Sequence, residues 1–362
     1  MTKKARHFRY MDVLNVLSCF AVVVLHCTTV VYVNQGNVQW FVSVALQSLF
    51  MFAVPVFFMI SGANLIGYRS RYSTKVFFQK RLKRVLATLV GFSLFIYILS
   101  CLVPTQLGLP PRSFSVAEFI DLLLTNRICD VYWFMYSILI LYLITPLLAS
   151  FASSKRLLEY AIGLCVVSTA IIPFANRFAP NHDLFSVFAV PYLTGAIMYY
   201  LIGYYIVTYS PLDKRDGKMR PAFLIAAICS VVFMALMTIK TNVAHTVLSG
   251  AYSDYDNFYN NYLHLPVLVY SVSLFMLFRS LEPLFQSDKY PFMAVISKLS
   301  SFSFDVYAVH MMLIWALDVY VPHSIFWDAA IRPFVVFALS LLFAFVLESL
   351  KKFCRNTRIA KV

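Results

Sequence analysis

The chain has 362 residues, of which 61% are hydrophobic and 13% are charged, and its mean hydropathy is +0.76. A soluble domain carries about twice this charged fraction, so the composition excludes a soluble fold. The net charge of +14 does not indicate a nucleic-acid partner. Lysines and arginines gather in short segments between apolar runs, as the positive-inside rule expects of cytoplasmic loops.

Ten apolar segments are long enough to cross a bilayer. The spans are predicted to be helices, because a helix satisfies its own backbone polar groups in lipid, and the alternating pattern of a β-barrel is absent. We therefore predict an all-α polytopic protein that forms a single domain over residues 1–362, with short basic tails at 1–9 and 350–362. The predicted spans are 10–33, 40–66, 85–103, 131–150, 159–175, 188–208, 221–240, 263–281, 302–321 and 325–348.

The distribution of basic residues predicts the topology. With the N-terminus in the cytoplasm, all but five of the 30 lysines and arginines fall on the cytoplasmic side. The five on the opposite side are Arg112, Arg127, Arg177, Lys240 and Arg332. An even number of spans with both termini in the cytoplasm fits this pattern, and we expect a multi-pass protein of the plasma membrane.

The first predicted span carries a polar stripe. Asp12, Asn15, Cys19, Val22 and His26 recur at spacings of three or four and share one helix face. The eleven residues from the asparagine to the histidine cover about three turns, or ~16 Å. An ionisable side chain in a membrane is costly and usually functional, and an imidazole can transfer protons near neutral pH. The alternative is a buried histidine hydrogen-bonded to a neighbouring helix.

Two features follow on the second and third spans. Ser61 and Gly62 are small residues that allow close approach of a ligand or of another helix. Arg81 and Arg84 lie three apart just before the third span, and such a pair of guanidinium groups suits phosphate. The alternative for the arginines is ordinary anchoring to lipid headgroups.

Further polar and aromatic residues lie at the edges of later spans. Trp133 opens the fourth span on the outer side, where an aromatic belt is the simpler explanation. Tyr307 and His310 share one face of the ninth span. We expect them either to contact substrate or to form a hydrogen-bonding pair in the core. In the outer loop 241–262, residues 252–257 suit sugar hydroxyls or pack within the loop. The seven cysteines show no metal-ligand spacing, so no metal site is predicted.

Taken in order, these motifs resemble those of the integral membrane acyltransferase family 3, whose members are often O-acetyltransferases of cell-surface glycans. The resemblance runs from the first span to the ninth. It rests on Met11–Asn15 with Leu25-His26, Val56–Gly62, Phe77–Arg81 with Arg84, Trp133-Phe134, Leu141–Leu143, Thr145-Pro146, and Phe304 with Tyr307 and His310.

The resemblance implies an enzyme that moves an acyl group, commonly acetyl, from cytoplasmic acyl-CoA to a hydroxyl of a cell-surface polysaccharide or lipid-linked sugar. His26 then corresponds to the essential histidine, as base or acyl carrier. Arg81 and Arg84 correspond to the basic pair that holds coenzyme A, and Ser61 and Gly62 to the small residues lining the site. Acyl-CoA is a donor substrate, and no tightly bound cofactor is expected.

This chain departs from the family pattern at one position, since members usually carry Arg or Lys where it has Asn15. An amide cannot balance a phosphate charge, so another cation fills the role, the donor sits differently, or activity is reduced. Two rival functions also stay open. They are a transporter or flippase for a polysaccharide or lipid-linked sugar, and a scaffold beside a glycan synthase. Membrane lipids and the sugar acceptor are the expected partners, with a homo-oligomer or a glycan synthase complex as further options.

Overall fold

The structure is a computed structural model that describes residues 7–33, 36–178, 195–210, 217–244, 255–286 and 292–359. Within these ranges the chain is helical and contains no strand. Nine of the helical stretches in the described residues are long and apolar enough to cross a membrane. The prediction of an all-α polytopic membrane protein is confirmed.

Each predicted span contains a described helix, although α4 begins eleven residues before the predicted 85 and α15 ends eleven residues after the predicted 348. The bounds are α1 (Arg9–Cys27), α2 (Val38–Phe50), α3 (Ala53–Leu65), α4 (Thr74–Leu102), α5 (Val116–Leu124), α6 (Trp133–Phe151), α7 (Lys155–Val166), α8 (Ile172–Phe178), α9 (Gly195–Tyr209), α11 (Arg220–Ala244), α12 (Leu265–Ser280), α13 (Glu282–Phe285), α14 (Phe292–Tyr320) and α15 (Arg332–Ile359). Short 3₁₀ or π turns lie at 29–32, 66–70, 105–107, 130–132, 167–171, 258–260 and 327–331.

Three differences from the predicted spans have clear causes. The second span is broken at Met51 and Phe52, because the ring of Pro55 clashes with the carbonyl four residues earlier and its nitrogen has no hydrogen to donate. The helix α14 begins ten residues before the predicted 302, because Ser297, Lys298, Ser300 and Ser301 interrupt its apolar sequence and hide its first turns from a hydropathy argument. Of the predicted span 188–208, residues 188–194 lie outside the described residues, and the rest forms α9.

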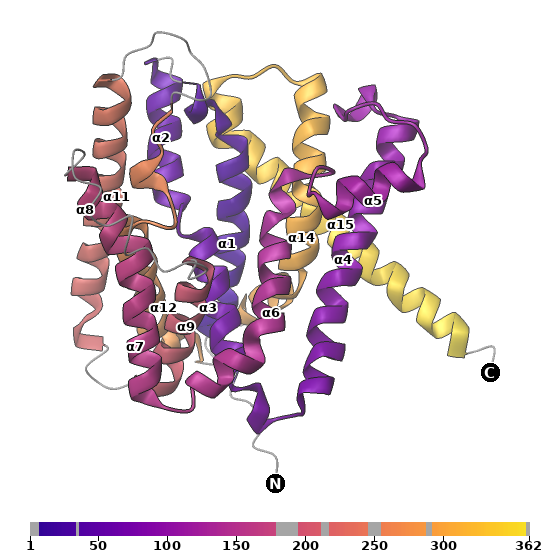
Figure 1. Cartoon of the computed structure of the whole chain (residues 1–362). Coiled ribbons are helices and arrows are strands. Elements are labelled where there is room, and N and C mark those ends of the chain that lie inside the picture. Colours follow the sequence, from indigo (N-terminus) through magenta and orange to yellow (C-terminus); the bar gives the residue numbers. More distant parts are fainter. Residues whose placement is uncertain are drawn as a thin grey trace.

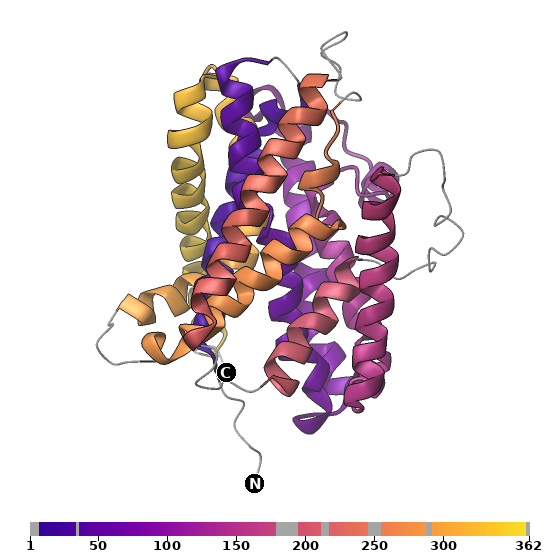
Figure 2. The same cartoon turned by 90° about the vertical axis from the view of Figure 1, so that its left-hand side faces the viewer.

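The N-terminal end of α1 and the C-terminal end of α15 lie at the same end of the bundle (Figure 1). We call this end the basic side. The helix α1 is central, because it packs against α2, α3, α12, α14 and α15. Its Leu14 and Ala21 are fully buried. Figure 2 shows α11 and α12 crossing the face of the bundle opposite α4 and α5.

Two glycines allow the backbones of α3 and α9 to pack in direct contact. A Cβ added at Gly62 would lie 1.8 Å from the backbone oxygen of Tyr200, and one at Gly203 would lie 2.0 Å from that of Met59. No real Cβ tolerates such distances, so the two backbones touch directly. This close approach is the reason why small residues are needed on both helices.

Larger side chains at this contact are expected to destabilise the fold. We expect Gly62→Val to lower the free energy of unfolding by at least about 1–3 kcal/mol, the usual cost of overpacking. Thermal unfolding in detergent measures the change. The control is Gly163→Val in α7, where an added Cβ meets nothing within 4 Å. Equal stability of the two variants would contradict the direct backbone contact.

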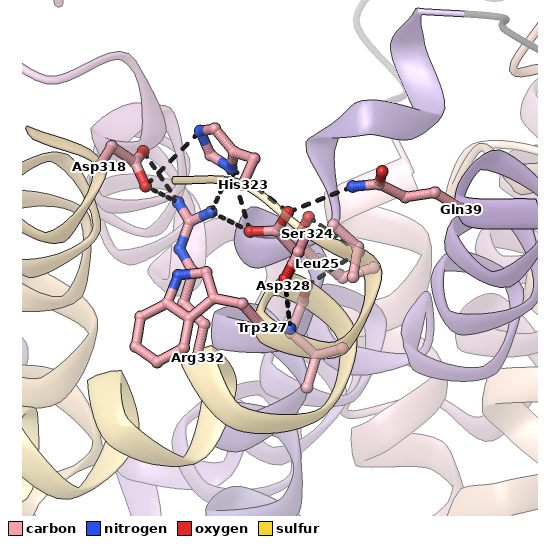
Figure 3. A network of polar contacts seen from close by, with 10 residues as sticks. Leu25, Gln39, Asp318, His323, Ser324, Trp327, Asp328 and Arg332 are labelled. Carbon is pink, nitrogen blue, oxygen red and sulfur yellow. Dashed lines mark hydrogen bonds and ion pairs between the residues drawn. The ribbon is translucent and has the colours of Figure 1, made fainter. Parts of the chain in front are cut away.

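A cluster of ionic side chains joins the ends of α14 and α15 on the side away from the termini (Figure 3). The Arg332 side chain is 2% exposed and forms ion pairs with Asp318 at 2.6 Å and with Asp328 at 2.8 Å. His323 contacts Asp328 at 3.0 Å, and Gln39 donates to the same carboxylate at 3.2 Å. The arginine therefore balances two acidic groups and connects α14, α15 and α2.

Loss of the Arg332 charge is expected to cost far more than loss of an exposed ion pair. The substitution Arg332→Met leaves the buried Asp328 without its cation, and we expect a loss of about 3–5 kcal/mol in unfolding free energy. The matched control is Arg127→Met, whose pair with Asp121 is 60% exposed on both sides and is worth at most about 1 kcal/mol. Chemical unfolding of both variants tests the difference, and similar losses would refute the assignment.

Candidate functional site

A cavity of about 290 Å³ lies among α1, α3, α4, α6 and α14 toward the basic side. It is the meeting point of the polar motifs in the first, second, third and ninth predicted spans. Its lining residues are Asn15, Phe57, Ile60, Ser61, Arg81, Arg84, Val85, Phe134, Ile138, Tyr142, Ser300, Ser301, Ser303, Phe304 and Tyr307. One wall is thus cationic, one carries hydroxyl groups, and the deeper part is aromatic.

The cationic wall belongs to α4. Arg81 and Arg84 lie three residues apart on this helix and both face the cavity. Within the described residues, neither guanidinium forms an ion pair, and the buried Nε of Arg81 has no hydrogen-bond partner. The hydroxyl of the buried Tyr142 lies beside Arg81 and Ser61. Two uncompensated positive charges beside a cavity favour an anionic ligand such as a phosphate.

The hydroxyl wall joins α1 to α14. The side-chain nitrogen of Asn15 donates to the carbonyl of Ser300 at 3.0 Å, to the hydroxyl of the same serine at 2.9 Å and to that of Ser303 at 3.1 Å. One helical turn earlier, Asp12 accepts from Ser297 at 2.5 Å and from Ser300 at 3.1 Å. The aspartate is buried and does not line the cavity, so only the asparagine of this pair is available to a ligand.

Three rings extend from the cavity toward the other side of the membrane. Tyr307 lines the cavity, and its ring centroid lies 5.5 Å from that of His310. The ring of His310 lies 5.3 Å from that of His26, at an interplanar angle of 40°. His26 is half-buried and does not line the cavity in this structure. The two imidazoles, from α1 and α14, therefore form a pair just beyond the tyrosine.

The backbone fixes the state of the fully buried His310. Its Nδ1 bonds the carbonyl of Tyr307 at 2.7 Å, so this nitrogen is the donor and carries the proton. In the neutral ring the other nitrogen, Nε2, is then an acceptor, and it has no partner among the described residues. A buried acceptor without a partner is costly. The imidazole pair therefore keeps one nitrogen free to receive a proton.

Tyrosine hydroxyls attach the 3₁₀ turn 130–132, which leads into α6, to α14 beside this pair. Tyr307 donates to the carbonyl of Val131, and Tyr132 donates to that of Ala308 at 2.6 Å. Trp133, the next residue, stacks on Tyr262 with parallel rings 5.4 Å apart, and it does not line the cavity. The structure thus places the tryptophan in an aromatic stack beside the site.

The residues predicted from sequence divide into two groups. Asn15, Ser61, Arg81, Arg84 and Tyr307 meet in the cavity, whereas Asp12, His26, Gly62, Trp133 and His310 lie outside its lining. Gly62 follows Ser61 directly, yet a helix turns by about 100° per residue, and the glycine faces α9 instead. Of the outer-loop segment 252–257, residues 252–254 lie outside the described residues.

Sequence reasoning missed the hydroxyl wall of α14. Ser297, Ser300 and Ser303 recur every three residues, the same interval that separates Asp12 from Asn15. This matched spacing is the signal that could have paired the two helices. Tyr142 stood within a recognised motif, but nothing in the sequence showed that it faces Arg81.

Comparison with protein families identifies the chain. A family model described as an acyltransferase domain, that of the acyltransferase family 3, matches residues 8–349. The chain belongs to this family. The match spans every helix that lines the cavity, so the cavity and the imidazole pair belong to a membrane acyltransferase. Comparisons with curated proteins and with solved structures gave no match.

Proposed function

We propose that this acyltransferase moves an acyl group, most simply acetyl, from cytoplasmic acyl-CoA to a hydroxyl of a cell-surface glycan or lipid-linked sugar. The plasma membrane is then its place of action, with the basic side toward the cytoplasm. The observation that carries the proposal is the pair Arg81 and Arg84, without ion-pair partners in the described residues, on a cavity that ends next to His310 and His26.

In this proposal the donor enters the cavity from the basic side. Its phosphates bind the two guanidinium groups, which can each offer forked N–H donors to phosphate oxygens. The uncharged arm then lies along the hydroxyl wall of Asn15 and Ser303, toward the aromatic end of the cavity. The thioester thereby approaches Tyr307. No resident cofactor is needed, because the donor itself is the activated group.

The position of the cations accounts for the departure at Asn15. Its side-chain nitrogen is committed to Ser300 and Ser303, so this amide organises α14 and carries no charge. The positive charge of the cavity comes from α4. Of the three explanations for the departure, the one in which other cations supply the charge fits this geometry best.

Transfer of the acyl group needs a base that removes the proton of the sugar hydroxyl. His26 removes the proton from the sugar hydroxyl, whose oxygen attacks the thioester carbonyl. The C–S bond breaks, an ester C–O bond forms, and the proton passes to the departing thiolate. In the alternative route, an imidazole nitrogen attacks the thioester carbonyl, the C–S bond breaks and the thiolate leaves. The sugar oxygen then attacks the acyl-imidazole, the C–N bond breaks as the ester forms, and the hydroxyl proton passes to the thiolate. Both routes need the ring of Tyr307 to move aside, since it separates the cavity from the imidazole pair.

The first test concerns the base. We expect His26→Ala to reduce acyl transfer by about 10²–10⁴-fold, the usual contribution of a positioned acid or base. Mass spectrometry of surface glycans from cells expressing equal amounts of each variant measures the transfer as a mass difference of one acyl group. The control is His323→Ala, which alters an exposed histidine at the far ends of α14 and α15. Undiminished acylation in the His26 variant would rule out its catalytic role.

The second test concerns the donor. A hydrogen bond to a charged group contributes about 1.5–3 kcal/mol, so we expect Arg81→Gln or Arg84→Gln to weaken binding of coenzyme A by roughly 10–100-fold. Titration calorimetry on the purified protein measures it. Lys83→Gln is the matched control, because this exposed lysine of α4 does not line the cavity. Unchanged binding in both arginine variants would favour a transporter, which releases no CoA.

A further inference from the structure

A second hollow lies on the outer surface of the bundle, where α4 and α15 diverge above α14. It has a volume of about 600 Å³, and α14 packs against both flanking helices. In Figure 1 the C-terminal part of α15 projects away from the bundle beside the lower half of α4. The lining residues of this groove are Arg84, Ala87, Thr88, Gly91, Phe92, Phe95, Asp305, Phe343, Leu347 and Lys351.

The groove has an apolar length and a charged end. Phe343 of α15 closes the apolar end, since its ring lies 6.1 Å from that of Phe92 and 6.2 Å from that of Phe95. Between this aromatic end and the charged end lies Gly91, where an added Cβ would meet nothing within 4 Å. The middle of the groove is therefore an open slot between α4 and α15.

The charged end carries more positive than negative charge. Arg84 and Lys351 stand against the single carboxylate Asp305, whose Oδ1 lies 3.9 Å from the lysine Nζ. The arginine has no ion-pair partner in the described residues, and the lysine side chain is 64% exposed. An anionic group placed between the two cations would compensate this excess.

The dimensions of the groove match one leaflet of a bilayer. Arg84 and Phe95 are eleven residues apart on one helix, or ~16 Å along its axis. This is about half of the ~30 Å hydrocarbon core. With the two cations of the basic side placed at the level of lipid headgroups, this length brings the aromatic end to about the bilayer midplane.

We propose that the groove binds an anionic phospholipid of the leaflet on the basic side. Its phosphate lies between Arg84 and Lys351, and one acyl chain fills the slot along Gly91 toward Phe343. Basic residues beside membrane helices attract anionic headgroups by roughly 1 kcal/mol each, and the slot adds contact with the chain. Because Arg84 lines both the groove and the first cavity, the lipid would shield this arginine from the bilayer. The proposal does not depend on the reaction proposed above.

Native mass spectrometry of the purified full chain tests the proposal. The probes are phosphatidylglycerol and phosphatidylcholine with identical acyl chains, titrated in a lipid-free detergent. We expect phosphatidylglycerol to bind at least about tenfold more tightly, because two cations contact its phosphate without a positive headgroup in competition. Lys351→Ala should bring its affinity close to that of phosphatidylcholine.

Variants that fill the slot distinguish the contribution of the lipid's acyl chain to the affinity from that of its headgroup. Gly91→Trp places a ring in the open space, and we expect it to weaken binding of both lipids. Ala87→Trp, one turn nearer the charged end, is the second variant if the first does not fold. The matched control is Gly163→Trp, which places the same ring on lipid-facing α7, where the space is also open. Thermal unfolding of each variant in the same detergent reports an intact bundle.

Three results of the titrations would overturn the proposal, and the identity of a retained lipid gives a fourth. The three titration results are equal affinity for the two lipids, wild-type affinity in the folded Trp variants, and equal loss in the Gly163→Trp control. Retention of a polyprenyl phosphate in place of phosphatidylglycerol in the same assay would assign the groove to a different occupant and also refute the proposal. None of these results bears on whether His26 is the base, so the two proposals fail separately.

Discussion

The hydrogen bonds between α1 and α14 hold the site together. Asp12 and Asn15 bond the serines of α14 in a continuous series. The sulfur of Cys19 continues the series, 3.6 Å from the carbonyl of Ser303. Because these bonds fix the register of the two helices, they also decide that His26 meets His310 three turns further along.

Most of the fold could be predicted from apolar length and charge alone. Backbone N–H and C=O groups in lipid must form their hydrogen bonds within the protein, and for apolar runs of this length only a helix achieves this. The breaks were harder to foresee, because Pro55 interrupts the second span although its surroundings stay apolar. The start of α14 was also missed, since Lys298 and Ser300 lie in a helix that continues beyond the apolar stretch.

The site could be predicted only in part, for a geometric reason. Periodicity along one helix shows which residues share a face, but not which other helix covers that face. Asp12 and Asn15 share a stripe with His26, yet α14 covers most of that stripe and leaves only the asparagine on the cavity. The arginines were found because two guanidinium groups three residues apart, just before a span, suit a phosphate ligand. Tyr142, an apolar-looking position within a span, gave no comparable signal.

The contact between α3 and α9 has a mechanical consequence. At Gly62 and Gly203 the two backbones touch without intervening side chains, so no rotamer change can widen this seam. The helices α3 and α9 thus form a rigid wall behind Ser61, and they do not separate when a large molecule enters. The cavity can therefore widen for a substrate only at its other walls, formed by α1, α4, α6 and α14.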